Sequence, residues 1–229
     1  MSDRIIAFSL YGDDPKYREG MKRNIRMAGE HYPGWRVVIY ATLNAPDFEL
    51  ASRSCTPDAE FSFLGDEQGS RGMFWRFQAA AASNADAILF RDADSDLNPR
   101  EAAAVNAWLA TDHLAHSMHD HRHHRLFPLH GGMWGVRGGV LPDIVQMIEA
   151  WHARASGHMG VKGRWCDDQW FLRERVYPRV EHSCLHHVCD ELLANPAYHW
   201  GGERFPPHEP YNGFVGQQRE RDGSPINPP

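Results

Sequence analysis

The chain has 229 residues, of which 42% are hydrophobic and 24% charged, and its net charge is −6 at pH 7. This length suits one α/β domain with a core that needs no disulfide bonds for support. The acidic balance argues against a general nucleic-acid binder. It does not exclude an anionic substrate, because a metal ion or an arginine cluster can reverse the sign of the charge inside a cleft.

Neither the cysteines nor the apolar runs indicate a secreted or membrane protein. The four cysteines form no Cys-x-x-Cys pair, so they suggest neither a zinc ribbon nor a disulfide framework. The first apolar run, Ile5 to Phe8, is too short for a signal peptide, and no stretch approaches the roughly 20 apolar residues of a membrane span. We therefore expect a cytoplasmic protein with no transmembrane segment.

In chain order, the first half alternates strands and helices. Residues 4–11 predict a buried strand, and Pro15 predicts the first turn of a helix that is capped by Asp13 or Asp14 and ends near His31. A strand over Arg36 to Ala41 completes a β-α-β unit, which predicts a parallel sheet. The further elements expected in this half are a short strand over 60–64 within a mixed stretch, a helix over 71–83, a strand over 87–90 and a helix from 99 to about 109.

The second half is less regular. It contains a histidine-dense stretch over 113–125, a tight glycine turn over 131–135 and two predicted helices over 141–155 and 167–175. From Asn195 onward the chain is rich in proline and glycine, which predicts an irregular tail that wraps over the body or frays at its end.

A carboxylate cluster follows the strand over 87–90, with aspartates at every second position: Asp92, Asp94 and Asp96. Ligands of open α/β sheets bind at the carboxyl edge of the strands. Two carboxylates directed at one point repel unless a cation lies between them, and oxygen ligands suit Mg²⁺ or Mn²⁺. The cluster therefore predicts a metal site formed by Asp92 and Asp94 in an enzyme that acts on a phosphorylated substrate.

Closely spaced aspartates also occur in calcium loops, in phosphohydrolases and in simple turns. A calcium loop of the EF-hand type fails here, because its sixth position is Leu97 instead of glycine and its twelfth is Ala103 instead of glutamate. A haloacid-dehalogenase-like phosphohydrolase would use Asp92 as its nucleophile. In such enzymes the nucleophilic aspartate ends the first strand of the fold, whereas Asp92 follows two or three earlier elements. The simplest alternative is a solvated acidic turn, with Asn98 capping the helix that begins at Pro99.

Several motifs taken together resemble a family of small bacterial and viral glycosyltransferases of the GT-A type. They lie at residues 72–77, 91–95, 97–101, 131–135 and 168–172, and the resemblance extends from residue 4 to about 190. It implies an α/β, GT-A-like fold: a Rossmann-type, mostly parallel sheet flanked by helices in a single domain over residues 1–229. A nucleotide-binding half would cover about 1–98, an acceptor half about 99–190 and an irregular tail about 195–229.

The resemblance also implies an activity. The protein would be a metal-dependent hexosyltransferase that moves a hexose from a nucleotide-diphospho-sugar to a saccharide or other hydroxyl acceptor, with Mn²⁺ or Mg²⁺ held by Asp92 and Asp94. Many such enzymes add a late histidine as a third ligand, for which we select His187 from His182, His186 and His187. The family has His-Asp-Ser in this region, whereas this chain has His186-His187-Val-Cys. A non-catalytic module of the same fold that binds nucleotide-sugar or carbohydrate is the leading rival.

Donor-binding residues are expected at the end of the first strand and near the aspartates. Tyr11 could stack on the base or simply pack at the edge of the core, and Ser9 lies beside it. Guanidinium groups bind phosphate in bidentate fashion, so Arg76 and Arg91 are candidates to neutralise the diphosphate. The alternative for Arg76 is a solvated helix face. Gly131 and Gly132 resemble a turn that lets the backbone approach a sugar, or they form an ordinary tight turn.

The remaining candidates concern catalysis and the acceptor. Asp168 would act as a general base in an inverting enzyme, orient sugar hydroxyls in a retaining one, or serve only as an acidic residue at a helix N-terminus. In the histidine-dense stretch, Asp120 and His121 could contact the acceptor. His119, His121 and His123 alternate and could instead bind zinc, or have no specific role.

Overall fold

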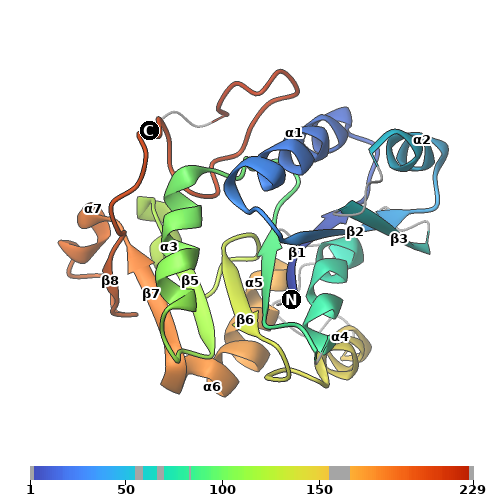
Figure 1. Ribbon diagram of the computed structural model, residues 1–229. Coiled ribbons are helices and arrows are strands. Elements are labelled where there is room, and N and C mark those ends of the chain that lie inside the picture. The colour runs from blue at the N-terminus through green and yellow to red at the C-terminus, as the bar shows by residue number, and fades with distance from the viewer. Residues whose placement is uncertain (1–2, 55–58, 66–69, 83, 155–165, 227–229) are drawn as a thin grey trace.

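The computed structural model of the protein describes residues 3–54, 59–65, 70–82, 84–154 and 166–226. Within these ranges eight strands form one sheet in the order β3-β2-β1-β4-β6-β5-β7-β8 (Figure 1). The strand β6 runs antiparallel to β4 and β5, and the other neighbouring pairs are parallel. The predicted α/β class with a mostly parallel sheet is therefore confirmed. The strands are β1 (Arg4–Leu10), β2 (Arg36–Thr42), β3 (Ala59–Gly65), β4 (Ala87–Arg91), β5 (Ala115–His119), β6 (Trp134–Arg137), β7 (Cys184–Val188) and β8 (Glu203–Arg204).

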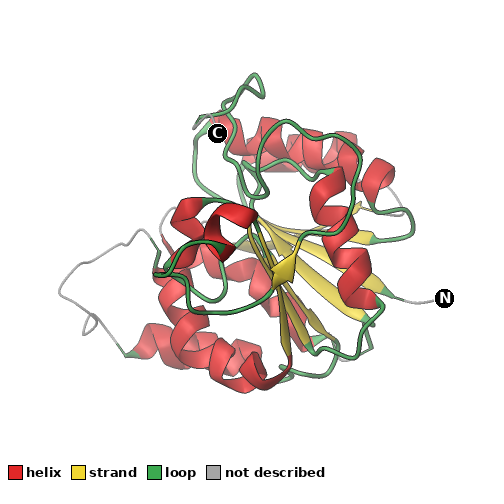
Figure 2. Ribbon diagram, turned by 90° about the vertical axis from the view of Figure 1, so that its left-hand side faces the viewer, coloured by secondary structure: helices red, strands yellow, loops and turns green. Residues whose placement is uncertain are grey.

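Helices pack on both faces of the sheet, which lies between them in Figure 2. One face is covered by α1, α2 and α3, and the other by the 3₁₀ helix η1 together with α4, α5 and the segments that follow it. The helical segments are α1 (Pro15–His31), α2 (Ala45–Ser54), η1 (Ser70–Ala81), α3 (Pro99–Leu109), η2 (Arg122–Arg125), α4 (Ile144–Ala153), α5 (Asp167–Phe171), the π-helical turn η3 (Leu172–Val176), α6 (Tyr177–Val180), η4 (Glu181–Ser183) and α7 (Asp190–Leu193).

The alternation of side chains along β1 produces the two cores. Ile5 and Ala7 pack against η1 and α4, whereas Ile6, Phe8 and Leu10 pack against α1 and α3. Successive side chains of a strand point to opposite faces, so a continuous apolar run is what a strand covered on both faces requires.

The two helix starts that the sequence marks with a proline agree with the structure at α1 and α3, whereas the helix expected from residue 141 begins at Ile144. The helix α1 begins at Pro15, and the Asp14 side chain accepts a hydrogen bond from the backbone N–H of Lys16 at 3.0 Å. The Asn98 side chain caps α3 in the same way, through the N–H of Glu101 at 3.0 Å. Both contacts satisfy amide groups that have no partner inside the helix.

The helix α2 and the strands of the second half are not predicted by the sequence pattern. β5 has the sequence AHSMH and β7 has CLHHV, and neither shows the apolar run or the alternation of a typical strand. All five β5 residues are nevertheless buried, because β6 and β7 pair with it on either side and α3 and η2 contact it. The expected helix over 71–83 is η1, and the helix over 167–175 is α5 continued by a π-helical turn.

The C-terminal tail crosses the molecule near α1 and α3, in red in Figure 1. Gln218 forms an isolated β-bridge with Ser95, and the N–H of Arg219 donates to the carbonyl of Asp94 at 2.8 Å. The side chain of Arg219 also lies 3.6 Å from Asp96, which pairs with Arg23 at 2.9 Å as well. The tail therefore wraps over the body as expected, and its place is fixed by the aspartate loop after β4. No described helix combines the length and the apolar character that a membrane crossing needs.

Candidate active site

Asp92 and Asp94 lie directly after β4, in the loop at the carboxyl end of the strand. The Asp92 side chain is 40% exposed, whereas that of Asp94 is 5% exposed. Asp94 Oδ2 accepts a hydrogen bond from Gln218 Nε2 at 3.2 Å and lies 3.6 Å from Lys16 Nζ. Burial and the charge of Asp92 raise the pKa of Asp94 to about 6, against the lowering effect of Lys16. The two carboxylates thus repel each other in a poorly solvated place, as they would around a cation site.

Arg76 is the buried cation of this region. Its Nη1 donates to Asp92 Oδ1 at 2.5 Å and its Nη2 to Asp168 Oδ2 at 3.0 Å. Burial alone would lower the pKa of Arg76, but Asp92 and Asp168 raise it above its ordinary value. The alternative of a solvated helix face is therefore wrong for Arg76, whose side chain is 5% exposed. One guanidinium joins the loop after β4 to the start of α5.

Asp168 has both of its oxygens engaged. Oδ2 pairs with Arg76, and Oδ1 accepts a hydrogen bond from the backbone N–H of Gln169 at 2.9 Å. Burial raises the pKa of Asp168 to about 6, against the lowering effect of Arg76. A carboxylate with this pKa is mostly ionised at pH 7, so it can hold the guanidinium in place.

Gly131 and Gly132 lie against these charged groups. A Cβ atom on Gly131 would fall 2.2 Å from Asp168 Oδ2 and 2.6 Å from Arg76 Nη2. A Cβ atom on Gly132 would fall 2.1 Å from Asp92 Oδ2 and 2.9 Å from the Asp92 backbone nitrogen. Only glycine permits this approach, so the pair is more than an ordinary turn.

A cavity of about 380 Å³ opens next to Asp92. Its walls come from the loop after β4, the segment 121–133, the start of α5 and the tail. The lining residues are Asp92, His121, His123, His124, Leu126, Phe127, His130, Gly131, Gly132, Met133, Cys166, Gln169, Phe214, Gly216 and Gln218. Asp168 is not among them, because Gly131 lies between it and the cavity.

Ser9 and Tyr11, the two donor-binding candidates at the end of β1, both contact η1, the helix that carries Arg76. Ser9 Oγ accepts a hydrogen bond from the backbone N–H of Arg76 at 3.0 Å, so Ser9 fixes η1 and the position of that arginine. The Tyr11 ring packs on Gly72, where a Cβ atom would fall 2.3 Å from the ring. Tyr11 also contacts Trp75 edge to face at 6.2 Å between ring centroids. One face of the Tyr11 ring is thus already covered by the protein.

Arg91 does not join the site. Its side chain is 3% exposed, pairs with Glu101 at 3.1 Å and donates to the carbonyls of Phe90 and Trp134. Tyr32 donates to the same Glu101 carboxylate at 2.7 Å. The expectation that Arg91 neutralises donor phosphates does not fit this geometry, because side chains alternate along β4 and Arg91 points into the core under α1 and α3.

His187 does not join the two aspartates either, which corrects its assignment as third metal ligand. It is buried on β7, with Nδ1 2.8 Å from His116 Nε2 and Nε2 3.3 Å from Glu203. Over the described ranges of the chain, no group of three or more histidine, cysteine, aspartate or glutamate side chains is arranged to hold a metal ion. The same finding argues against zinc at His119, His121 and His123. His119 ends β5, His121 directly precedes η2, and His123 lies within η2.

Of the two acceptor candidates, Asp120 is engaged in contacts within the protein and His121 lines the cavity. Asp120 is 8% exposed and forms two contacts of 2.7 Å with Arg100, and it also accepts a hydrogen bond from the N–H of Val215 at 2.9 Å. It anchors the tail to α3 and has no free oxygen to offer an acceptor. His121 does line the cavity, stacked on Phe214 at 4.4 Å between ring centroids.

Sequence reasoning assigned no site role to several residues that line the cavity, among them His130, Cys166, Gln169, Phe214 and Gln218. Cys166 has a φ of 71°, which a non-glycine residue adopts at a cost of about 1–2 kcal/mol. It precedes α5, so this turn sets the direction from which Asp168 and Gln169 enter the site. For His130 the neighbouring glycine pair was an available signal, whereas Gln218 lies in a tail that no motif marked.

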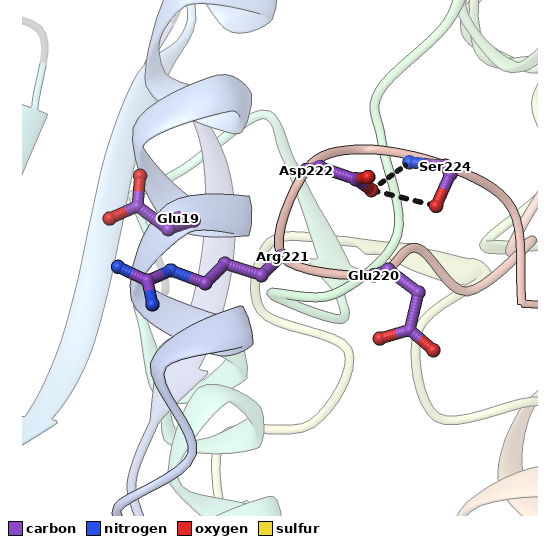
Figure 3. Close-up of a pocket in the computed structure, with 5 residues that line it drawn as sticks. All are labelled: Glu19, Glu220, Arg221, Asp222 and Ser224. Atoms are coloured by element: carbon purple, nitrogen blue, oxygen red, sulfur yellow. Dashed lines mark hydrogen bonds between the residues drawn. The ribbon is translucent and has the colours of Figure 1, made fainter.

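Two other cavities share no residue with this one. The first, of about 640 Å³, lies between Glu19 of α1 and the tail turn over 220–224 (Figure 3). Its Asp222 carboxylate is used within the turn, where it accepts hydrogen bonds from the N–H and the hydroxyl of Ser224. The second, of about 390 Å³, is formed by β3, η1 and α4.

Comparison with known proteins gives matches among solved structures alone. No family model matches the chain, and no curated protein does. A mannosyltransferase from Pyrobaculum calidifontis, solved with GDP-Man and Mn²⁺, is 17% identical and has a TM-score of 0.47, with 62% of this chain and 46% of that one covered. A glucosyl-3-phosphoglycerate synthase from Mycobacterium tuberculosis, solved with Mn²⁺, UDP and phosphoglyceric acid, is 15% identical with a TM-score of 0.43, over 61% of this chain and 57% of that one.

A third solved structure is matched over more of the chain. The galactosyltransferase LgtC, solved with donor and acceptor sugar analogs, is 12% identical with a TM-score of 0.47. The match covers 82% of this chain and 73% of LgtC. The chain therefore spans about half the length of the first two matched structures and about three quarters of the third.

Proposed function

We propose that the protein is a metal-dependent glycosyltransferase that transfers a hexose from a nucleotide-diphospho-sugar to an acceptor hydroxyl. One observation carries the proposal: Asp92 and Asp94 follow β4 at the carboxyl edge of the sheet, where Asp92 pairs with the buried guanidinium of Arg76 and lines a cavity. Binding sites of open α/β sheets lie at this edge. The motifs that resemble GT-A enzymes contribute these same residues.

The donor set fits Mn²⁺ or Mg²⁺ shared with a substrate. Two carboxylates are the protein ligands such an ion commonly has when substrate phosphates and water complete its coordination. Asp94 is buried and its pKa is raised by burial and by Asp92, so a cation would relieve a repulsion already present in the structure. When bound, the ion would supply Lewis-acid stabilisation of the leaving nucleoside diphosphate.

Arg76 and Asp168 would organise the charge of the site. Arg76 fixes the orientation of Asp92 through Nη1, and it is held by Asp168 through Nη2. We therefore propose a positioning role for Asp168 in place of the general base suggested by its sequence motif. Its two engaged oxygens and its position behind Gly131 support this assignment.

A thermal-shift panel tests the proposal. Unfolding temperatures would be measured with nucleoside diphosphates and nucleotide-sugars, each with Mn²⁺, Mg²⁺ or EDTA, for the wild type and Asp94→Ala. A ligand at 100 times its Kd adds about 2.7 kcal/mol, which corresponds to several degrees for a domain of this size. We expect a metal-dependent shift with one nucleotide that Asp94→Ala abolishes.

Asp96→Asn is the matched control, because Asp96 belongs to the same loop but pairs with Arg23 and Arg219. It should retain the nucleotide shift even where its own stability falls. The absence of any nucleotide shift in the wild type would reject the proposal. Hydrolysis of a generic phosphate ester that depends on Asp92 would favour the phosphohydrolase, and donor binding without transfer or donor cleavage would favour the binding module.

A further inference from the structure

The cavity beside Asp92 has an unusual charge balance for a site that handles phosphates. Among its described lining residues Asp92 is the single one with a full charge at neutral pH, and none is lysine or arginine. Arg122 and Arg125, which neighbour lining residues in the chain, are exposed on η2 and do not line it, and neither do Arg91 and Arg219. Arg76 is buried and already shared between two carboxylates. The part of the wall that the structure describes thus offers no cation to a second anionic group.

Three histidines of the wall, His121, His124 and His130, do not supply that cation either. Burial lowers the pKa of His121, places that of His124 well below its ordinary value and lowers that of His130 to about 4. His130 Nε2 also lies 2.7 Å from the carbonyl of His124, a contact in which the neutral ring donates. These imidazoles are therefore neutral hydrogen-bonding groups at pH 7.

The rest of the wall combines aromatic faces with amides. The Phe214 ring lies nearly parallel to that of His121, at an interplanar angle of 18°, and Phe127 meets Trp170 edge to face at 5.3 Å. Gln169 and Gln218 add amide groups that both donate and accept. A pyranose ring has an apolar face and a rim of hydroxyl groups, so it can pack on the aromatic rings and hydrogen-bond to the amides and imidazoles.

We propose that this cavity binds the acceptor and that the acceptor is a neutral saccharide, with the Phe214–His121 pair as its aromatic platform. The inference rests on the proposed function and adds the class of acceptor. A phosphorylated or carboxylated acceptor would bury its charge beside Asp92 against a described wall without a cation, which is unfavourable. Phe214 belongs to the tail, so the tail supplies part of the acceptor site.

The test uses a panel of immobilised neutral glycans and of sulfated, phosphorylated and uronic-acid glycans. Binding of the full chain would be measured with Mn²⁺ and the nucleoside diphosphate that gives the largest thermal shift. We expect the wild type to bind neutral glycans and to discriminate against the anionic ones at least tenfold. Preferential binding of anionic glycans, or no binding to any glycan, would overturn the proposal.

Variants separate the platform from general stability. Phe214→Leu keeps an apolar side chain but removes the ring, and it should lose neutral-glycan binding about tenfold while keeping the nucleotide thermal shift. Leu126→Lys, at a lining residue that is 57% exposed, adds a cation to the described wall and should raise binding of anionic glycans. Phe48→Leu, on α2 and outside the cavity, is the matched control and should change neither. If the nucleotide shift persists and these glycan effects do not appear, the acceptor inference is wrong while the proposed function stands.

Discussion

Arg76 and Asp168 are 92 positions apart in the chain, yet their side chains form a buried ion pair of 3.0 Å. The pair joins η1 to α5 directly beneath the glycine turn at Gly131, where it fixes the floor of the candidate site. Arg76 is itself positioned from β1, through the hydroxyl of Ser9. The site is therefore organised by one shared cation in addition to the aspartate motif.

Replacing Arg76 by Met should be strongly destabilising. The change would leave the buried Asp168 carboxylate without its partner, and an uncompensated buried charge costs on the order of 3–5 kcal/mol. Asp92 is partly exposed, so water would screen its contribution. The free energy of unfolding, from urea denaturation, is the measurement. Arg53→Met, which breaks an exposed pair with Glu49, is the control, and a similar cost for the two variants would contradict the prediction.

Gly132→Ala should impair the site, because the new Cβ atom would fall 2.1 Å from Asp92 Oδ2 and 2.9 Å from the Asp92 backbone nitrogen. Overpacking of this kind costs about 1–3 kcal/mol, and here it would also displace a proposed metal ligand. Titration with Mn²⁺, followed by electron paramagnetic resonance, should show weaker binding by at least tenfold. The control is Gly29→Ala, within α1, where a Cβ atom meets nothing within 4 Å. It should stabilise the helix by up to about 1 kcal/mol and leave Mn²⁺ binding unchanged.

His187→Gln should leave metal binding intact, since His187 pairs with His116 and Glu203 and is not grouped with the two aspartates. Asp94→Asn should weaken Mn²⁺ binding strongly. Isothermal titration with Mn²⁺ in the presence of a nucleoside diphosphate compares the two variants with the wild type. Equal losses of affinity in both would restore His187 as a ligand.

Asp120→Ala should loosen the tail. The variant leaves Arg100 without its bidentate partner and the buried N–H of Val215 without an acceptor, at a cost of about 1–3 kcal/mol. Hydrogen exchange of the amides over 214–219 should become faster than in the wild type, whereas exchange in β1 should not change at native pH. Unaltered exchange in the tail would show that Asp120 does not anchor it.

The buried histidines make the stability depend on pH. Six of them have a pKa lowered mainly by burial: His116, His119, His124, His130, His186 and His187. The values for His130 and His186 fall to about 4, from an ordinary value of 6.5. Between pH 6.5 and 4 the unfolded chain therefore binds more protons at these residues, and stability is lost as the pH falls, by at most about 1.4 kcal/mol per pH unit for each histidine.

Two carboxylates act in the opposite direction. The pKa values of Asp94 and Asp168 are raised to about 6, so below pH 6 these groups bind protons in the folded state before they do in the unfolded chain. Six histidines outweigh two carboxylates, and we expect the free energy of unfolding to fall between pH 6.5 and 4.5 in urea denaturation. His186→Gln should remove about one proton from the difference in proton binding between the unfolded and folded states, and the slope should become smaller accordingly. A stability that rises toward pH 4.5 would contradict the assignment of neutral histidines.

The first half of the fold could be predicted from the sequence because its signals are local. A continuous apolar run such as Ile5–Leu10 indicates a buried strand wherever it occurs, and Pro15 and Asn98 mark helix starts by contacts with their own neighbours. β5 and β7 lack such signals. Their histidines and serine are buried because other segments of the chain cover them, and His119 lies within hydrogen-bond distance of both Ser117 and His186.

The same division holds for the site. By itself, the sequence determined that Asp92 and Asp94 follow a buried strand, since that depends on adjacent residues. The tertiary structure alone decided which side chains join them. It added Gln218, it selected Arg76 and the glycine pair from the candidates that the sequence offered, and it placed Arg91 and His187 in other buried contacts. The physical reason is that strand alternation and long-range packing, not residue type, select the face and the partner of each charged side chain.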